Sequence, residues 1–199
     1  MSRAWQYQTA DEQNYFAVAL RGSKAADDAA GHNIVILVDT SASQKGDHRL
    51  RTMEVLRHTI NHFSADDRVQ IIAVDVDATS ISNGFIPTQG SDIEAAITAL
   101  NRRVPLGASD LQLGITAAMN SLAGQTNGAI VYFGDGMSTA GLIPYDELAE
   151  LAQRLRKSEL PVHSFAVGPK TDLQLLGTLA QFSGGTVTVD GAVTTSEDA

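Results

Sequence analysis

The chain has 199 residues, of which 43% are hydrophobic and 19% are charged, and its formal net charge is −9. This length indicates one domain with a core of its own, and the hydrophobic fraction excludes a disordered chain. The negative charge argues against nucleic-acid binding, which requires a cationic surface, and the absence of cysteine excludes disulfides and thiolate metal sites.

No segment of the sequence has the features of a secretion signal or a membrane anchor. The first fifteen residues lack an apolar core, and no apolar run approaches the length of a membrane span. We therefore expect no membrane insertion. The compartment stays open, because a cysteine-free domain is stable in oxidising and reducing surroundings. The chain is also compatible with a piece of a larger cell-surface or secreted protein.

The first thirty residues precede the regular pattern of the chain. Residues 14–20 alternate in hydrophobicity, which predicts a short strand, and residues 23–31 form a linker of small and acidic residues. We expect this part, residues 1–31, to add at most an edge strand to the domain that follows.

From residue 33 onward, strand patterns alternate with helix patterns. The strand patterns are short and apolar, and they cover 33–39, 68–77, 128–133, 161–167 and 185–190. The helix patterns repeat apolar residues at spacings of three and four, and they cover 50–63, 91–100, 109–122, 144–155 and 172–182. This order predicts an α/β fold, a doubly wound, mostly parallel central sheet with helices on both faces and an antiparallel edge strand. The predicted domain spans 32–190, and a polar tail follows at 191–199.

Local patterns predict the faces and ends of several of these elements. In the first helix, Leu50 belongs to the predicted buried stripe and Arg49 to the solvent face. Ser91 has Glu94 three residues later, and Ser109 has Gln112, so both serines are candidate helix N-caps. Residues 81–85 are expected to form a hairpin or a short edge strand around Asn83-Gly84.

Short oxygen-bearing side chains follow the predicted strands at three places. Asp39, Ser41 and Ser43 come after the first buried strand, Ser109 lies in a second loop, and Asp135 follows the strand at 128–133. In a doubly wound sheet, ligands bind at the carboxyl ends of the strands near the topological switch point. We therefore expect these five side chains to gather at one edge of the sheet.

Two carboxylates and three hydroxyls are ligands for a hard cation. Oxygen donors without His or Cys favour Mg²⁺, Mn²⁺ or Ca²⁺. The two negative charges are fewer than a closed Ca²⁺ site usually carries, which makes Mg²⁺ our first choice. Five side chains leave a coordination position open for a carboxylate from a partner.

The order Asp39-x-Ser41-x-Ser43, then Ser109, then Asp135 resembles the metal-ion-dependent adhesion site of von Willebrand factor type A domains, including integrin inserted domains. Ser109 stands where the family usually has Thr. The likeness covers about residues 33–190. The stretch before it is similar to what precedes this domain in inter-alpha-trypsin-inhibitor-like and bacterial members of the family.

The resemblance implies a binding module without catalysis, in which a divalent cation accepts an acidic side chain of a protein partner. Around the cation, Asp110 is expected to interact with the helix dipole or through a water molecule. Gln44, Lys45 and Met137 are expected near the rim, with Tyr145 as a further contact, and Lys45 is a candidate to pair with the incoming acid. The oligomeric state stays open.

Two other functions remain as alternatives. A metal-dependent phosphatase-like hydrolase also has an Asp after a first strand, but it needs a second Asp two residues later as acid and base, and here that residue is Ser41. The third possibility is a structural domain whose metal site is unused.

Two other residue pairs are weaker candidates for ligand binding. Asp75 and Asp77 form a D-x-D pair at a strand end, where solvated carboxylates are common. His58 and His62 have a zinc-compatible spacing on a helix, but no third ligand accompanies them.

Overall fold

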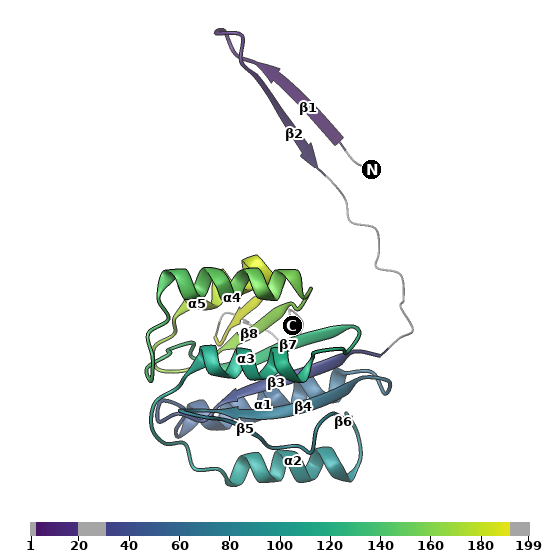
Figure 1. Ribbon diagram of the computed structural model, residues 1–199, viewed down its shortest axis with the longest axis vertical. Coiled ribbons are helices and arrows are strands. Elements are labelled where there is room, and N and C mark those ends of the chain that lie inside the picture. The colour runs from purple at the N-terminus through teal and green to yellow at the C-terminus, as the bar shows by residue number, and fades with distance from the viewer. Residues whose placement is uncertain (1–2, 20–30, 192–199) are drawn as a thin grey trace.

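A computed structural model describes residues 3–19 and 31–191 of the chain (Figure 1). Most of the predicted linker and nearly all of the predicted polar tail lie outside the described residues. The described part contains a two-stranded hairpin near the N-terminus and a larger sheet covered by helices.

The larger sheet has a parallel centre and an antiparallel edge. The parallel strands, in spatial order, are β4 (Arg68–Val74), β3 (Asn33–Asp39), β7 (Gly128–Gly134), β8 (Val162–Ala166) and β9 (Val187–Val189). Two short strands pair antiparallel with β4, namely β5 (Ala78–Ser80) and β6 (Ile86–Pro87). The predicted α/β fold with a mostly parallel sheet and an antiparallel edge is confirmed.

Residues 81–85 form neither a hairpin nor a strand of their own, so that prediction is wrong. They connect β5 to β6, and both of these strands pair with β4 instead of with each other. Side chains explain the difference, because the Ser82 hydroxyl accepts a hydrogen bond from the Ile71 backbone N–H at 3.0 Å. The Arg68 guanidinium donates to the Phe85 carbonyl at 2.6 Å, and this bond fixes the far end of the connection.

Helices cover both faces of the sheet. On one face lie α1 (Asp47–His62) and α2 (Ser91–Arg102), and on the other lie α3 (Leu111–Ser121), α4 (Tyr145–Lys157) and α5 (Leu173–Ser183) (Figure 1). Among the described residues, no helix is both long enough and apolar enough to cross a membrane.

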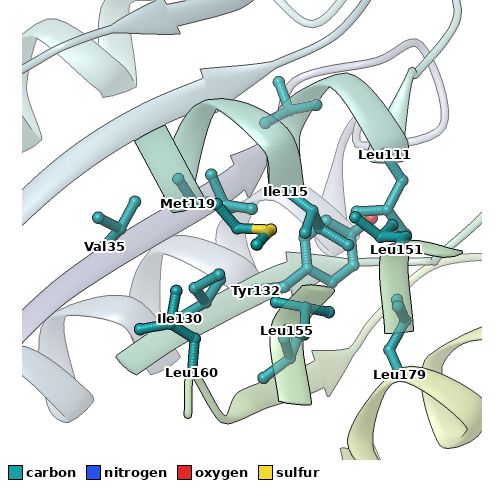
Figure 2. Packing of buried hydrophobic residues seen from close by; sticks show 14 of the residues in the cluster. Val35, Leu111, Ile115, Met119, Ile130, Tyr132, Leu151, Leu155, Leu160 and Leu179 are labelled. Atoms are coloured by element: carbon teal, nitrogen blue, oxygen red, sulfur yellow. The ribbon is translucent and has the colours of Figure 1, made fainter. Parts of the chain in front are cut away.

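The alternation of side chains along each strand creates two cores. In β3, Val35 and Leu37 face α3, α4 and α5, whereas Ile36 and Val38 face α1 and α2. Figure 2 shows the first core, in which Tyr132 lies among leucines and isoleucines from three helices. A strand buried on both faces needs apolar residues at every position, which is why β3 reads as a continuous apolar run.

The strand predicted at residues 14–20 is present, but it does not pair with the larger sheet as an edge strand. β2 (Asn14–Ala19) pairs antiparallel with β1 (Arg3–Gln8) and not with the edge of the larger sheet. The short turn between them makes this local pairing the easier one, since little chain entropy is lost in closing it. Nearly every described residue of this hairpin is exposed.

The structure corrects the predicted face of the first helix. Leu50 is 69% exposed, whereas Arg49 is only 8% exposed and lies in line with Met53, Leu56 and Ile60. Arg49 is tolerated there because its guanidinium donates to the Leu100 carbonyl at 2.7 Å, near the C-terminus of α2. A cation at that end of a helix interacts favourably with the helix dipole.

The predicted cap of α2 is also absent. The N-cap residue is Gly90, with a φ of 102°, and no side chain caps the helix. The hydroxyl of Ser91 is instead 3.3 Å from the Asp92 carboxylate.

Two helical glycines offer a matched test of the packing of α3 against the sheet. A Cβ at Gly114 would lie 2.8 Å from a methyl of the buried Val74, whereas a Cβ at Gly177 in α5 would meet nothing within 4 Å. We expect Gly177→Ala to stabilise the protein by about 0.5–1 kcal/mol, through the helix propensity of Ala. Gly114→Ala should destabilise it by about 1–2 kcal/mol, because overpacking outweighs that gain. Urea unfolding measures both, and equal effects of the two variants would contradict the close packing.

Candidate metal site

The topology brings the first and third predicted loops together at the switch point of the sheet. β3 pairs with β4 on one side and with β7 on the other. The sheet therefore extends in one direction from β3 to β4 and in the opposite direction from β3 through β7, and the topological switch point lies between β3 and β7. Val38 is opposite Phe133 in the parallel register. Asp39 follows Val38 directly, and Asp135 follows Phe133 after one further residue, Gly134. Both carboxylates therefore lie at the same carboxyl edge of the sheet, where open α/β sheets bind ligands.

The loop after β3 is folded by its own polar groups. The Ser41 N–H donates to Asp39 Oδ1 at 2.7 Å, and the hydroxyls of Ser41 and Ser43 are 2.9 Å apart. Asp39 is fully buried, and Ser41 is 4% exposed. The three residues that the sequence spaces two apart thus have their oxygen atoms on one side of the loop.

Tyr132 connects this loop to the loop after β7. Its hydroxyl donates to Asp39 Oδ2 at 3.2 Å and accepts a hydrogen bond from the Gly136 N–H at 3.1 Å. Tyr132 is not among the residues predicted from the sequence. The signal was nevertheless present, because a tyrosine within a strand buried on both faces needs a partner for its hydroxyl.

The loop that carries Ser109 lies between the other two and is bonded to both. On one side, the Ala42 N–H donates to the Gly107 carbonyl at 2.9 Å, and the Leu106 N–H donates to the Thr40 carbonyl at 3.0 Å. On the other side, the Ala140 N–H donates to the Ser109 carbonyl at 2.9 Å. The structure therefore brings the three predicted loops into one assembly.

Ser109 has a buried hydroxyl with no hydrogen-bond partner. The residue is 1% exposed, and its Oγ contacts no donor or acceptor of the described residues. The helix cap that the sequence assigned to Ser109 belongs to Asp110, whose carboxylate accepts a hydrogen bond from the Leu113 N–H at 2.9 Å. An unpaired buried hydroxyl costs free energy, so a ligand that bonds to the Ser109 Oγ would recover this cost.

Burial makes the site costly for negative charge. It raises the pKa of Asp39 to about 6, and the charge of Asp135 acts in the same direction, while hydrogen bonds from Ser41 and Tyr132 oppose the shift. Burial also lowers the pKa of Arg49, and the charge of Asp39 opposes that shift, so the two groups interact through space. A bound cation would relieve this cost.

The donor set fits a hard divalent cation. Two buried carboxylates and three serine hydroxyls supply only oxygen, which suits Mg²⁺ or Mn²⁺ better than softer metals. Within residues 3–19 and 31–191, no three His, Asp or Glu side chains gather in a way that could hold a metal. The candidate site therefore depends on its hydroxyls as well as on its carboxylates.

Glycines allow the carboxylates to lie this close to the backbone. A Cβ on Gly134 would be 2.5 Å from the Cβ of Asp39, and a Cβ on Gly168 would be 2.7 Å from the Cβ of Asp135. Gly168 has a φ of 155°, in the range that favours glycine. The backbone of β7 and of the loop after β8 thus forms part of the wall around the acids.

A cavity of about 370 Å³ opens beside the candidate ligands. Of the predicted rim residues, Met137 lines this cavity, whereas Gln44, Lys45 and Tyr145 are absent from its lining. Gln44 is buried, and its side-chain amide donates to the Val167 carbonyl at 3.0 Å. The lining also contains Lys170, which the sequence analysis did not consider.

Asp75 of the D-x-D pair lies behind the first loop. Its carboxylate accepts hydrogen bonds from the Thr40 hydroxyl at 3.0 Å and from Arg103 Nη2 at 2.7 Å. Partial burial acts to raise the pKa of Asp75, but Arg103 and the Asp77 N–H outweigh it, and the net shift is downward. Asp75 is thus bonded within the protein.

The two helical histidines have a local interaction only. The rings of His58 and His62 lie 4.1 Å apart, and His62 Nδ1 is 2.8 Å from the His58 carbonyl of the same helix turn.

The raised pKa of Asp39 gives a prediction for the metal-free protein. Between pH 3.8 and about 6 the folded protein holds a proton that the unfolded chain releases, so stability falls as the pH rises through this window. Asp39→Asn removes this cost, and at pH 7.5 in EDTA we expect it to stabilise the fold by on the order of 1–3 kcal/mol. Urea unfolding from pH 4 to 8 measures the difference, which should shrink toward pH 4. A difference independent of pH would contradict the assigned cause.

Comparisons with known proteins agree with this fold. The model of the von Willebrand factor type A domain family matches residues 32–189. A von Willebrand factor type A structure from Catenulispora acidiphila superimposes with a TM-score of 0.70 at 16% identity, covering 80% of this chain and 38% of that one. A comparison with curated proteins finds no match.

Two further similar structures are described as metal-bound. Proximal thread matrix protein 1 from the mussel byssus, with a zinc-occupied MIDAS motif, has a TM-score of 0.63 at 16% identity and covers 82% of this chain and 43% of that one. The manganese-loaded TRAP protein of Plasmodium vivax has a TM-score of 0.58 at 14% identity, and the match covers 91% of this chain and 66% of that one. These identities show a shared fold only. The family match over most of the length confirms the predicted resemblance, and the chain belongs to the von Willebrand factor type A domain family.

Proposed function

We propose that this domain binds a divalent cation through Asp39, Ser41, Ser43, Ser109 and Asp135, and that the cation accepts a carboxylate of a protein partner. The observation that carries the proposal is the buried Ser109 hydroxyl, which has no hydrogen-bond partner although its loop is bonded to the loops of both carboxylates. Most buried polar groups in native proteins have a partner in the protein, a water molecule or an ion.

Neighbouring groups orient the two proposed carboxylate ligands. Asp39 is held by the Ser41 N–H and the Tyr132 hydroxyl, and Asp135 by the Met137 N–H at 2.9 Å. Hydrogen bonds of this kind fix the ligands of a metal before it arrives. When bound, the cation supplies a positive charge and an open coordination position for an incoming carboxylate.

The nature of the cation is part of the proposal. The oxygen-only donor set favours Mg²⁺, with Mn²⁺ or Ca²⁺ as alternatives. The zinc and manganese named for two similar structures support a divalent cation at this place in the fold. The net charge of −9 disfavours nucleic acid as a partner.

Thermal unfolding tests the metal site with a matched pair of serines. Ser109 and Ser164 both have a buried Oγ without a partner among the described residues, but Ser164 lies in the middle of β8. We expect Mg²⁺ or Mn²⁺ at a hundred times its Kd to stabilise the wild type by about 2.7 kcal/mol relative to EDTA. That corresponds to a rise in Tm of roughly 5–10 °C.

In this experiment Ser109→Ala should have nearly wild-type stability in EDTA, because no hydrogen bond is lost, and most of the metal-induced rise should disappear. Ser164→Ala should keep the rise, and Asp39→Ala should lose it. An equal rise in all four proteins would mean general screening of the negative charge. No rise in the wild type would favour a structural domain with an unused site.

A hydrolase is the alternative that the site supports less well. Ser41 occupies the position where a phosphatase of this type needs an acid and base, and a serine hydroxyl does not titrate in the required range. With Mg²⁺ present, we expect the protein to hydrolyse p-nitrophenyl phosphate no faster than buffer without protein does. Turnover that Asp39→Ala abolishes would overturn the binding function.

A further inference from the structure

Lys170 is the cationic residue in the lining of the cavity beside the candidate metal site. The same cavity is lined by Ser41, Ser43 and Asp135, which are three of the proposed ligands. A group bound at the proposed cation would therefore share this cavity with Lys170. Lys45, which the sequence analysis placed near an incoming acid, does not line the cavity.

The loop that carries Lys170 is fixed on both sides of this residue. Before it, the Val167 carbonyl accepts from Gln44 at 3.0 Å, and the Val167 N–H donates to the Gly134 carbonyl at 3.0 Å. After it, the Asp172 N–H donates to the Asp135 carbonyl at 2.8 Å. The backbone of Lys170 is thus tied to the loops of both proposed carboxylate ligands.

The ammonium group of Lys170 has no partner within the described parts of the chain. It forms no ion pair there, and the nearby Asp172 uses its carboxylate to cap α5 through the Leu175 N–H at 2.9 Å. The cavity wall next to it contains the apolar side chains of Ala42, Met137 and Pro169. Lys170 and these three residues are exposed, so solvent partly screens an ion pair formed there and its contribution is modest.

We propose that Lys170 binds a second carboxylate of the partner, so that the site selects a protein segment with two neighbouring acidic side chains. This inference rests on the proposed function, since the first carboxylate is the one assigned to the cation. Asp39 and Asp135 together balance the charge of a divalent cation. Lys170 is then the uncompensated charge in the lining, and its complement is an acid separate from the one at the metal.

Small carboxylates test this proposal on the Mn²⁺-loaded protein. Acetate probes the cation alone, and succinate, glutarate and adipate add a second carboxylate at increasing distance. Their Kd values follow from the fall in water-proton relaxivity as bound water is displaced from Mn²⁺, at constant ionic strength. In the wild type we expect one of the dicarboxylates to bind about tenfold more tightly than acetate, of which a factor of two is statistical.

Variants of the two lysines separate a specific contact from a general charge effect. Lys170→Gln should reduce the preference for the dicarboxylate to about twofold while the Mn²⁺ affinity stays the same, and Lys170→Arg should retain the preference. Lys45→Gln is the matched control and should keep the full preference. The proposal is overturned if Lys170→Gln keeps the wild-type preference, or if Lys45→Gln loses as much of it.

Acetate binding separates failure of the proposed cation site from failure of the role of Lys170. If Mn²⁺ binds but acetate does not displace its water, the proposed function fails, and the role of Lys170 fails with it. If acetate binds and no dicarboxylate exceeds the statistical factor, only the role of Lys170 is overturned.

Discussion

The Tyr132 hydroxyl is the contact on which the geometry of this edge of the sheet depends. It is buried, it donates to the carboxylate that ends β3, and it accepts from the backbone of the loop that follows its own strand, β7. Burial raises the pKa of Tyr132 well above its ordinary value, and the charges of Asp39 and Asp135 act in the same direction. The phenol therefore remains a neutral donor wherever the domain is folded, and the two loops keep one relative position.

In the proposed site, the arrangement of the acids lowers the stability of the ligand-free fold. The carboxylates of Asp39 and Asp135 are both buried, and the buried Arg49 interacts through space with Asp39. Burying a charge without close pairing costs free energy, which a small domain has in short supply. Functional sites commonly carry such a cost because the groups are then oriented before the ligand arrives.

The sequence predicts the fold well where its signals are local and repeated. The apolar runs of β3 and β7 and the heptad-like spacing of Met53, Leu56 and Ile60 specify strands and helices without reference to the rest of the chain. The positions of the candidate ligands follow from the same patterns, since strand ends in a doubly wound sheet lie at one edge.

The details that escaped prediction depend on partners distant in sequence. Arg49 is buried because of a carbonyl on α2, and Ser82 replaces a strand contact because Ile71 lies beside it. Lys170 reaches the cavity because Gln44 and Asp135 fix its loop, more than thirty residues away along the chain. No periodicity in the sequence encodes such pairings, which arise only when the elements pack.

The glycines beside the acids have a consequence for how this site can be lost during evolution. A single methyl group at Gly134 or Gly168 would displace a carboxylate while leaving every oxygen donor in the sequence. A descendant with Ala at either position would still carry Asp-x-Ser-x-Ser and Asp135. A sequence search for those residues alone would wrongly count it as able to bind a metal at the proposed site. The proposed metal site thus depends on Gly134 and Gly168 as well as on the five residues proposed to supply oxygen ligands.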